Sequence, residues 1–536
     1  MVPTPLCAPD GRKRIHLMPE EAGNTRLSLL LAAAMFVLVV DTSLMNVSIS
    51  SVVGDLDTTV SAVQGAIALE ALVSAAFILI SSKLGDLFGR KRAYILGLLA
   101  YASGALAMTL AQSLTAVIVF WAIIGGLGAS LLLPAMQSLI HGNFEGAAQK
   151  KTYAMVGAAA AIAAAVGPLL GGFVTTYLSW RVGFLLEVVV IAVVLSQIGL
   201  VKDVPYTGDR QVDFVGAGLS VVGMGGVVLG ILVWQEGGDY VLLLIAVGAL
   251  ALWALARWLV RRHREGKATV LDPDLFGLPR FRIGITGQML QNITLGGAMI
   301  ALPIFLQVKL EYDALQTGLS IAPLSLTMFA VAILAGRRSG KRHPARVIRT
   351  GFALSTLGLA LIIPIVPEAD TGWYLLVPLV IAGAGLGLLV SQLNNYTLAP
   401  IDEQRISEAA GVNSAAGSFG LSFGLAVAGG VLLATLSLAF TNMTNASPEI
   451  PSSQQQQIAQ TLEDDAQVVS NTELDERLAE EPEPVQEEIL TINTDATNLA
   501  LQVALLVPIL AGLLGLFSAI RMVRLPDVEP AEAVPS

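Results

Sequence analysis

Long uninterrupted runs of apolar residues follow one another along the chain, and short polar or charged stretches separate them. A continuous apolar run of about 20 residues predicts a helix that crosses a bilayer, whereas the strands of a membrane β-barrel alternate over about 10 residues. The abundance of Gly and Ala in these runs predicts helices that pack closely together. The fourteen predicted spans are residues 27–50, 62–81, 93–111, 114–139, 153–176, 181–201, 213–234, 240–260, 283–308, 315–336, 347–366, 372–396, 411–440 and 497–520.

The composition excludes the soluble classes of protein. Of the 536 residues, 54% are hydrophobic and only 13% are charged, whereas a soluble protein carries about 25% charged residues. A soluble enzyme, a nucleic-acid-binding protein and a disulfide scaffold are therefore excluded. The sequence also lacks a nucleotide-binding P-loop, a cluster of metal ligands and a catalytic triad. We expect an all-α polytopic membrane protein without enzymatic activity, cofactor or metal.

The distribution of Lys and Arg predicts the orientation of the spans. If the N-terminus is cytoplasmic, the outer loops receive only Arg181, Lys309 and Arg477 of the 31 basic residues. The others fall on the cytoplasmic side, as the positive-inside rule requires. We therefore expect both termini in the cytoplasm and the protein in the inner or plasma membrane.

Most of the negative charge comes from one segment. Residues 441–497 contain thirteen acidic residues and a single base, Arg477, within a chain whose net charge is −10. The predicted topology makes this segment a long outer loop. It is a solvated, partly helical loop in the simpler interpretation. In the alternative, its charge attracts cationic solutes to the outer mouth of the protein.

The loop after the second span carries a dense motif. Gly85 and Gly89 permit a tight turn, and Asp86 can accept charge-assisted hydrogen bonds. The cluster can hold the cytoplasmic ends of two helices together as a latch. The motif resembles the cytoplasmic signature of the major facilitator superfamily, Gly-x-Leu-Gly/Ala-Asp-x-x-Gly-Arg-Arg/Lys-Arg/Lys. It reads Ser82-Lys83-Leu84-Gly85-Asp86-Leu87-Phe88-Gly89-Arg90-Lys91-Arg92.

Two further motifs strengthen this resemblance. The fifth span contains Gly167-Pro168-Leu169-Leu170-Gly171-Gly172, which resembles the antiporter signature of the same superfamily. Pro168 bends the helix, and the glycines let a neighbouring helix approach the bend. The first span contains Val40 to Ile49, with Asp41 and Asn46, which resembles a stretch of the fourteen-span drug–proton antiporters.

The resemblance covers essentially the whole chain and implies two six-helix halves with two extra helices between them. We divide the chain into a cytoplasmic N-terminal tail (1–26), an N-terminal half (27–202), two inserted helices (213–260), a cytoplasmic linker (261–282), a C-terminal half (283–524) that includes the acidic outer loop 441–496, and a cytoplasmic tail (525–536).

One departure from the family concerns the fourth span. The family carries an Arg there that is implicated in proton transfer, and Ala122 stands at that position. The usual route of proton coupling is therefore not carried over to this chain.

Three acidic residues lie inside the predicted spans, namely Asp41, Glu70 and Glu187. A carboxylate in the bilayer interior costs about 3 kcal/mol or more, so each is a functional candidate. No Lys or Arg lies deep in any span to neutralise them. We expect Asp41, with help from Glu70 or Glu187, to carry the coupling proton and to exchange it for a cation. Glu70 and Glu187 are structural acids in the alternative.

The second half offers neutral polar residues instead. Gln288, Gln291 and Asn292 share one face of the ninth span, at the i, i+3 and i+4 positions. They either line a substrate cavity or bond one helix to another. The candidate lining of the cavity is Asn46, Gln288, Gln291, Asn292, Asn394 and Asn395.

These features favour a secondary active exporter of amphipathic, cationic small molecules that works by proton antiport. The expected partners are the substrate, protons and membrane lipids, with no nucleic acid, and we expect a monomer. One alternative is an exporter or flippase of a lipid or cell-envelope metabolite without proton coupling, which the absent Arg favours. A membrane sensor or scaffold that transports nothing is a second alternative, which the retained motifs oppose.

Overall fold

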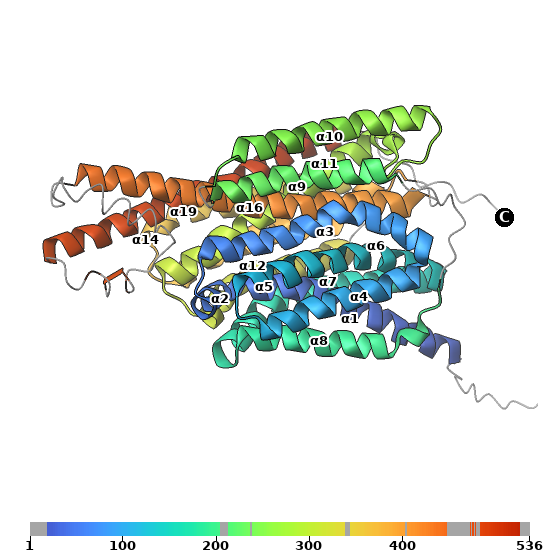
Figure 1. Cartoon of the computed structure of the whole chain (residues 1–536), viewed down its shortest axis with the longest axis horizontal. Coiled ribbons are helices and arrows are strands. Elements are labelled where there is room, and N and C mark those ends of the chain that lie inside the picture. The colour runs from blue at the N-terminus through green and yellow to red at the C-terminus, as the bar shows by residue number, and fades with distance from the viewer. Residues whose placement is uncertain are drawn as a thin grey trace, which may run out of the picture.

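The computed structural model of the chain describes residues 19–203, 213–235, 238–337, 343–401, 405–447, 472, 474–475, 478 and 483–525. The side chains of residues 19–24, 86, 146, 147, 150, 406 and 407 lie outside that description. All regular structure in the described part of the chain is helical, and most helices run along the long axis of the molecule (Figure 1).

The helices follow the predicted spans in order. The N-terminal half contains α1 (Pro19–Val47), α2 (Ile49–Leu56), α3 (Val60–Phe88), α4 (Arg90–Leu110), α5 (Leu114–Ala116), η1 (Val117–Gly125), α6 (Gly126–Asn143), α7 (Gly146–Tyr177), α8 (Trp180–Ser196) and η2 (Ile198–Leu200). The inserted helices are α9 (Phe214–Gln235) and α10 (Val241–Arg264), and η3 (Pro273–Gly277) lies in the linker. The C-terminal half contains α11 (Pro279–Ile304), η4 (Phe305–Lys309), α12 (Ala314–Arg337), α13 (Pro344–Ile362), α14 (Ile365–Glu368), η5 (Gly372–Leu375), α15 (Leu376–Leu398), α16 (Ile406–Ala446) and α19 (Glu483–Arg524).

Polar residues at the ends of the apolar runs start the helices. Thr59 caps α3 by accepting a hydrogen bond from the Ala62 amide at 3.0 Å, and Ser179 caps α8 through the Arg181 amide at 3.3 Å. Asp213 accepts from the Gly216 amide at 2.9 Å at the start of α9. Each cap satisfies one of the amides that a helix N-terminus leaves without a partner.

Thirteen helices among the described residues are long and apolar enough to cross a membrane. The remaining predicted span, residues 181–201, corresponds to α8, which has 17 residues. The all-α membrane fold is therefore confirmed, and the count of fourteen spans stays a prediction.

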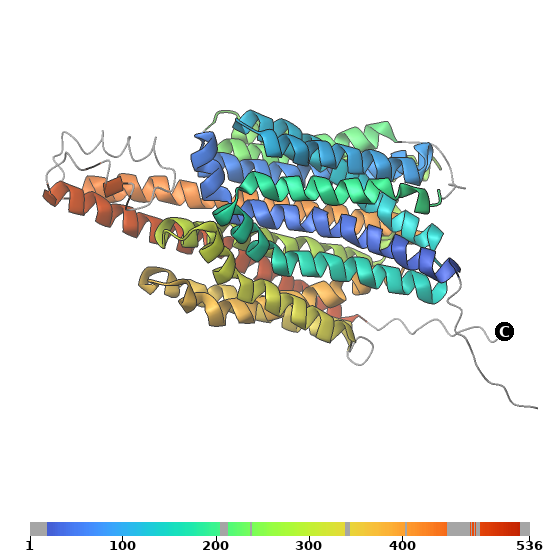
Figure 2. The ribbon, with the colours of Figure 1, turned by 90° about the horizontal axis from the view of Figure 1, so that it is seen from below.

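The two halves meet along two seams. In one seam α3 packs against α16, and in the other α7 packs against α12. The inserted helix α9 lies on both α3 and α16, with α10 outside it. The inserted pair therefore covers one seam rather than standing apart from the bundle (Figures 1 and 2).

Two helices are far longer than a span. α16 has 41 residues and α19 has 42, about 60 Å each at about 1.5 Å per residue, against a hydrocarbon core of about 30 Å. Both project beyond the rest of the bundle at one end (Figure 1). We call residues 431–446 and 483–499 the stalk. Its helices bury apolar residues against each other: Leu432, Leu436, Phe440, Val485, Ile489 and Ile492.

The stalk changes the picture of the acidic loop expected over 441–496. Residues 441–446 belong to α16, and residues 483–496 belong to α19. Residues 448–471, which carry four of the acidic side chains, lie outside the described residues. Four of the thirteen acidic residues, Glu483, Glu487, Glu488 and Asp495, therefore lie on a stalk helix rather than in a loop.

Candidate functional site

Asp41 lies in the middle of the N-terminal half, where it accepts hydrogen bonds from two aromatic side chains. The Trp121 indole Nε1 of η1 donates to the two carboxylate oxygens at 3.0 and 2.9 Å, and the Tyr101 hydroxyl of α4 donates to Oδ2. All three side chains are at most 3% exposed. The buried Asp41 is therefore held by charge-assisted hydrogen bonds rather than by a basic residue.

The other two predicted acids come to the same place. Glu70 on α3 and Glu187 on α8 each lie within electrostatic range of Asp41. Tyr101 lies within range of all three carboxyl groups. We call Asp41, Glu70 and Glu187, with Tyr101 and Trp121, the acid cluster. Residues from five helices thus form one buried site.

Glu187 differs from Asp41 in its partners. Both of its carboxylate oxygens are buried, and neither accepts a hydrogen bond from any described residue. One turn earlier on α8, the Phe184 ring stands edge-on to Trp121 at 6.2 Å between ring centroids. An ionised carboxylate in such apolar surroundings is costly, so this group requires a proton or a cation.

The backbone of the fourth predicted span brings Trp121 into the cluster. The segment η1 is π-helical, a form that is often found at functional sites. Ala122, at the position of the family's Arg, is fully buried and offers no side-chain donor. The neighbouring Trp121 supplies the donor to Asp41 instead. Sequence reasoning did not single out Trp121 or Tyr101, although buried aromatic residues with a polar atom usually find a hydrogen-bond partner.

The glycines of the fifth span bring three helices together beside Asp41. A Cβ on Gly167 would lie 2.5 Å from the Ser43 Cβ, and one on Gly171 would lie 2.8 Å from the Leu44 Cα, both on α1. A Cβ on Gly172 would lie 2.5 Å from the carbonyl oxygen of Ala314 on α12. The motif therefore joins the helix that carries Asp41 to the C-terminal half.

The halves are hydrogen-bonded to each other at the stalk end. The Gln307 side chain accepts from the Ser50 amide at 3.2 Å and from its hydroxyl at 2.6 Å, and donates to the Val47 carbonyl at 2.9 Å. The Leu315 amide donates to the Thr176 hydroxyl at 3.1 Å. One hydrophobic core runs through both halves at this end, whereas the opposite end of the N-terminal half has a core of its own. The hydrogen bonds and the shared core therefore join the two halves at the stalk end.

The comparison of sequences decides the family. Residues 31–212 and 210–425 match the Major Facilitator Superfamily. The chain belongs to this superfamily. Its members are transporters rather than enzymes, so the chain is a multi-pass membrane transporter.

Relatives that are themselves transporters agree with this assignment, and a solved structure shares the fold. The chain is 26% identical to the probable actinorhodin transporter of Streptomyces coelicolor, over 73% of this chain and 69% of the relative. It is 29% identical to the drug efflux pump JefA of Mycobacterium tuberculosis, over 78% and 81%. The crystal structure of the peptide transporter POT in complex with sulfate has the same fold, with a TM-score of 0.56 at 16% identity, over 92% of this chain and 94% of that one.

The polar residues expected to line the cavity of this transporter differ in the partners of their side chains. Asn394 accepts a hydrogen bond from Asn413 at 3.0 Å, which bonds α15 to α16. Gln291 is buried, and its Oε1 has no hydrogen-bond partner among the described residues. Gln288 and Asn292 both approach Gly417 of α16, within 3.5 Å of where a Cβ would lie.

The remaining predicted residues bond mainly to their own helices. The Asn46 amide nitrogen donates to the Thr42 carbonyl at 2.8 Å, while its buried Oδ1 has no partner in the described part of the chain. Asn395 donates to the Ser391 carbonyl at 3.5 Å. None of the described hydrogen bonds links Gln288, Gln291 or Asn292 to the acid cluster. A role for these residues in substrate binding stays a prediction.

The superfamily's cytoplasmic motif makes a contact that the sequence did not predict. Gly89, at φ 99°, is the single residue between α3 and α4, and a Cβ there would lie 2.9 Å from the Asp203 Oδ2. The Asp203 Oδ1 accepts from the Lys91 amide at 3.1 Å. The Asp86 side chain lies outside the description, so the predicted latch stays a prediction.

The chain after α8 is positioned by Asn143, which exchanges two 3.0 Å hydrogen bonds with the Lys202 backbone.

Proposed function

We propose that the chain is a secondary active exporter of amphipathic, cationic small molecules, driven by proton antiport with alternating access. The observation that carries the proposal is Glu187, a buried carboxyl group without a hydrogen-bond donor from the described residues. Such a group is stable when it holds a proton or faces a cation, and these two states are what an exchanger of protons for cations needs.

The partners of the three acids suggest how they divide the work. Asp41 already accepts hydrogen bonds from Tyr101 and Trp121, which offset part of the cost of a buried ionised carboxylate. Glu187 has no such support, so we assign the exchange of proton for substrate to Glu187. Asp41 then supplies fixed negative charge that attracts the cation. Glu70, which is 9% exposed at the edge of the cluster, extends that negative field.

The relatives support the direction of transport. Their names describe a transporter of actinorhodin and an efflux pump for drugs, so we propose export by this chain as well. The sequence contains no nucleotide-binding loop, which favours an ion gradient as the energy source. We propose both termini in the cytoplasm, in line with the positive-inside rule, so the stalk would face outward.

An exporter of a lipid or cell-envelope metabolite without proton coupling is the second candidate. Ala122 favours it, because this buried residue replaces the Arg to which the family's proton transfer is attributed. The two candidates differ in whether substrate binding releases a proton.

The test is proton release from the purified protein in weak buffer on addition of ethidium, an amphipathic cation. We expect release from the wild type and none from Glu187→Gln. The control is Glu368→Gln, which removes an exposed acid at the stalk end and should leave release unchanged. If the wild type binds ethidium at every pH without releasing protons, the uncoupled exporter is favoured instead.

A further inference from the structure

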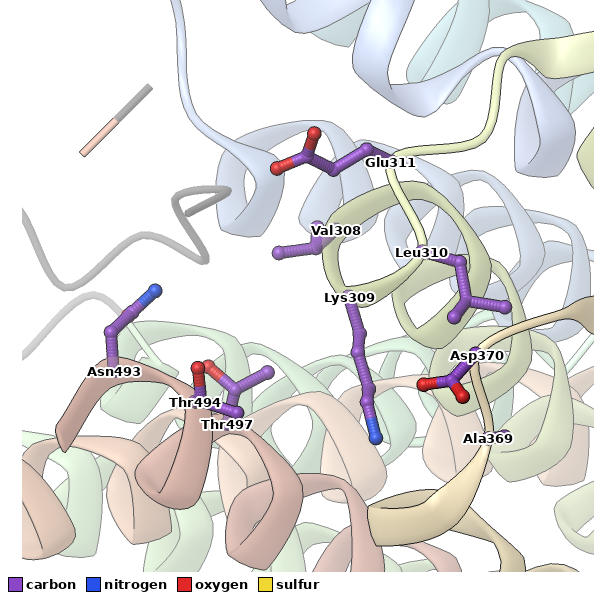
Figure 3. Close-up of a pocket in the computed structure, with 9 residues that line it drawn as sticks. All are labelled: Val308, Lys309, Leu310, Glu311, Ala369, Asp370, Asn493, Thr494 and Thr497. Carbon is purple, nitrogen blue, oxygen red and sulfur yellow. The ribbon is translucent and has the colours of Figure 1, made fainter. Parts of the chain in front are cut away.

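A pocket lies apart from the acid cluster, at the base of the stalk. It has a volume of about 330 Å³, within the range of about 300 to 1,000 Å³ that is usual for small-molecule sites. Its walls come from the η4–α12 connection, the α14–η5 connection and α19. Asn493, Thr494 and Thr497 face Lys309 and Asp370 across it, with Glu311 at its upper edge (Figure 3).

Two of the three charged groups in the pocket are already bound to other parts of the protein. The Lys309 ammonium group donates to the carbonyl oxygens of Val366 and, at 3.0 Å, Pro367 at the end of α14. Glu311 accepts from the Thr472 amide at 3.0 Å and from the Thr472 hydroxyl at 2.6 Å. These contacts occupy Lys309 and Glu311 and fix the two walls of the pocket.

Asp370 is the charged group that stays available. Its side chain is exposed to the pocket and makes no hydrogen bond with the described residues, although Lys309 lies within electrostatic range. Thr494 places a half-buried hydroxyl on the opposite wall. The lining therefore combines two carboxylates with one ammonium, and the Asp370 carboxylate interacts with Lys309 only at longer range, without a hydrogen bond or salt bridge to a described residue.

The surrounding charge has the same sign. The stalk carries four acidic residues, Glu483, Glu487, Glu488 and Asp495, and no Lys or Arg. A concentration of one sign of charge at the mouth of a cleft raises the local concentration of the opposite ion. The charge therefore favours a cationic rather than an anionic occupant.

We propose that this pocket is a second binding site for monovalent organic cations, with the cationic group paired to Asp370 between α19 and the α14–η5 connection. The proposal rests on the proposed function, since the pocket lies at the stalk end, which the proposed orientation places on the outer side. It assigns to the stalk the role of completing a site on the transporter's surface. Binding here displaces no buried proton, because Asp370 is exposed.

The test measures the reaction of a cysteine in the pocket with charged thiol reagents. The chain has one cysteine, Cys7, so Cys7→Ser with Thr494→Cys gives a single reactive site on the full-length protein. We expect a cationic methanethiosulfonate to react about 10-fold faster than an anionic one at low salt, and this ratio to fall in high salt. Ethidium should protect the site against both reagents.

Matched variants distinguish cation binding at Asp370 from general attraction by the surrounding acidic residues. Adding Asp370→Asn should reduce the ratio of the two rates and abolish ethidium protection, whereas Asp313→Asn, at the same end but outside the pocket, should change neither. Thr491→Cys, an exposed threonine one turn earlier on α19, reports the field alone and should gain no ethidium protection. Equal rates for the two reagents, or full protection in Asp370→Asn, would overturn the proposal.

The acid cluster is distinguished in the same assay. In Glu187→Gln, ethidium protection of Thr494→Cys should persist, although proton release is lost. Protection that disappears with Glu187→Gln would show that the effect comes from the central site and would contradict a second one. Persistent protection in a protein that never releases protons would support the pocket while refuting the antiport mechanism.

Discussion

The Trp121 indole nitrogen lies 3.0 and 2.9 Å from the two carboxylate oxygens of Asp41, one residue before the position at which the family's arginine is replaced by Ala122. The indole is a neutral donor, so it orients the carboxylate without cancelling its charge. The cluster consequently holds three carboxyl groups with no basic side chain among their described contacts. This arrangement suits a site that attracts cations.

Trp121→Phe tests this relationship. The substitution keeps the aromatic ring and removes the donor, so Asp41 retains only Tyr101. A hydrogen bond to a charged group contributes about 1.5–3 kcal/mol, and we expect thermal unfolding in detergent to show a loss of this order. The pH profile of transport should move upward, because the ionised carboxylate loses support. Trp253→Phe, on the exposed face of α10, should alter neither property.

Asp41→Asn should abolish uphill export driven by a pH gradient, since the fixed charge that attracts the cation is lost. Substrate binding should persist in weakened form, because Glu70 and Glu187 stay in place. The measurement is ethidium accumulation in inverted vesicles with an imposed gradient, alongside equilibrium binding to the purified variant. Undiminished uphill transport would show that Asp41 is structural.

Gly172→Ala should weaken the seam between α7 and α12. The new methyl group would lie 2.5 Å from the Ala314 carbonyl oxygen, so the helices must separate. We expect lower stability by about 1–3 kcal/mol, as for overpacked cores, together with slower transport. Gly157→Ala on the same helix is the control, because no atom lies within 4 Å of its new Cβ. It should be neutral or stabilising through helix propensity, and equal losses in both variants would contradict the packing argument.

Gln307→Ala should loosen the junction of the two halves at the stalk end, because Gln307 bonds to both Ser50 and Val47 of the other half. Amide hydrogen exchange should increase over residues 47–56 and 305–312. Gln502→Ala removes a hydrogen bond of similar length, 2.9 Å to Ile363, within the C-terminal half. Exchange at residues 47–56 should be unchanged in that control, so a similar increase there would argue against a role in joining the halves.

Replacing residues 448–482 with a neutral Gly/Ser linker should preserve transport at saturating substrate. The removed acidic residues contribute charge rather than chemistry, so apparent affinity for ethidium should weaken at low salt and approach the wild-type value at high salt. Transport assays at two ionic strengths measure this effect. Complete loss of activity in a correctly inserted variant would show that the segment has a direct part in the transport cycle.

The sequence by itself determined the fold class and the positions of the spans. The length of an apolar run is a local property of the sequence, and it must match the thickness of the bilayer. The runs around Asp41 and Glu187 were therefore recognisable without any tertiary contact. The close approach at Gly167 to Gly172 was predictable for a similar reason, since a residue without a side chain allows a neighbour to approach wherever it lies.

The tertiary structure alone decided which side chains meet. Tyr101 and Trp121 lie 60 and 80 positions after Asp41 in the sequence. Their contact with Asp41 depends on how α1, α4 and η1 cross. The contact of Asp203 with Gly89 and Lys91 likewise depends on how the chain returns after α8. Hydropathy carries no information about such crossings, because every face of these helices is apolar enough for the membrane.

The lengths of the two stalk helices also could not be predicted from hydropathy alone. Polar residues interrupt the apolar pattern after Phe440 and before Thr497, so span length predicted that the helices would end there. They continue because Leu436 and Phe440 of α16 share a buried core with Ile489 and Ile492 of α19. A stripe at helical spacing stabilises a helix only when a partner covers it. The sequence therefore determined which segments are apolar enough to span the bilayer. Tertiary packing determined how far α16 and α19 continue past their apolar runs and how the buried carboxyl groups are arranged.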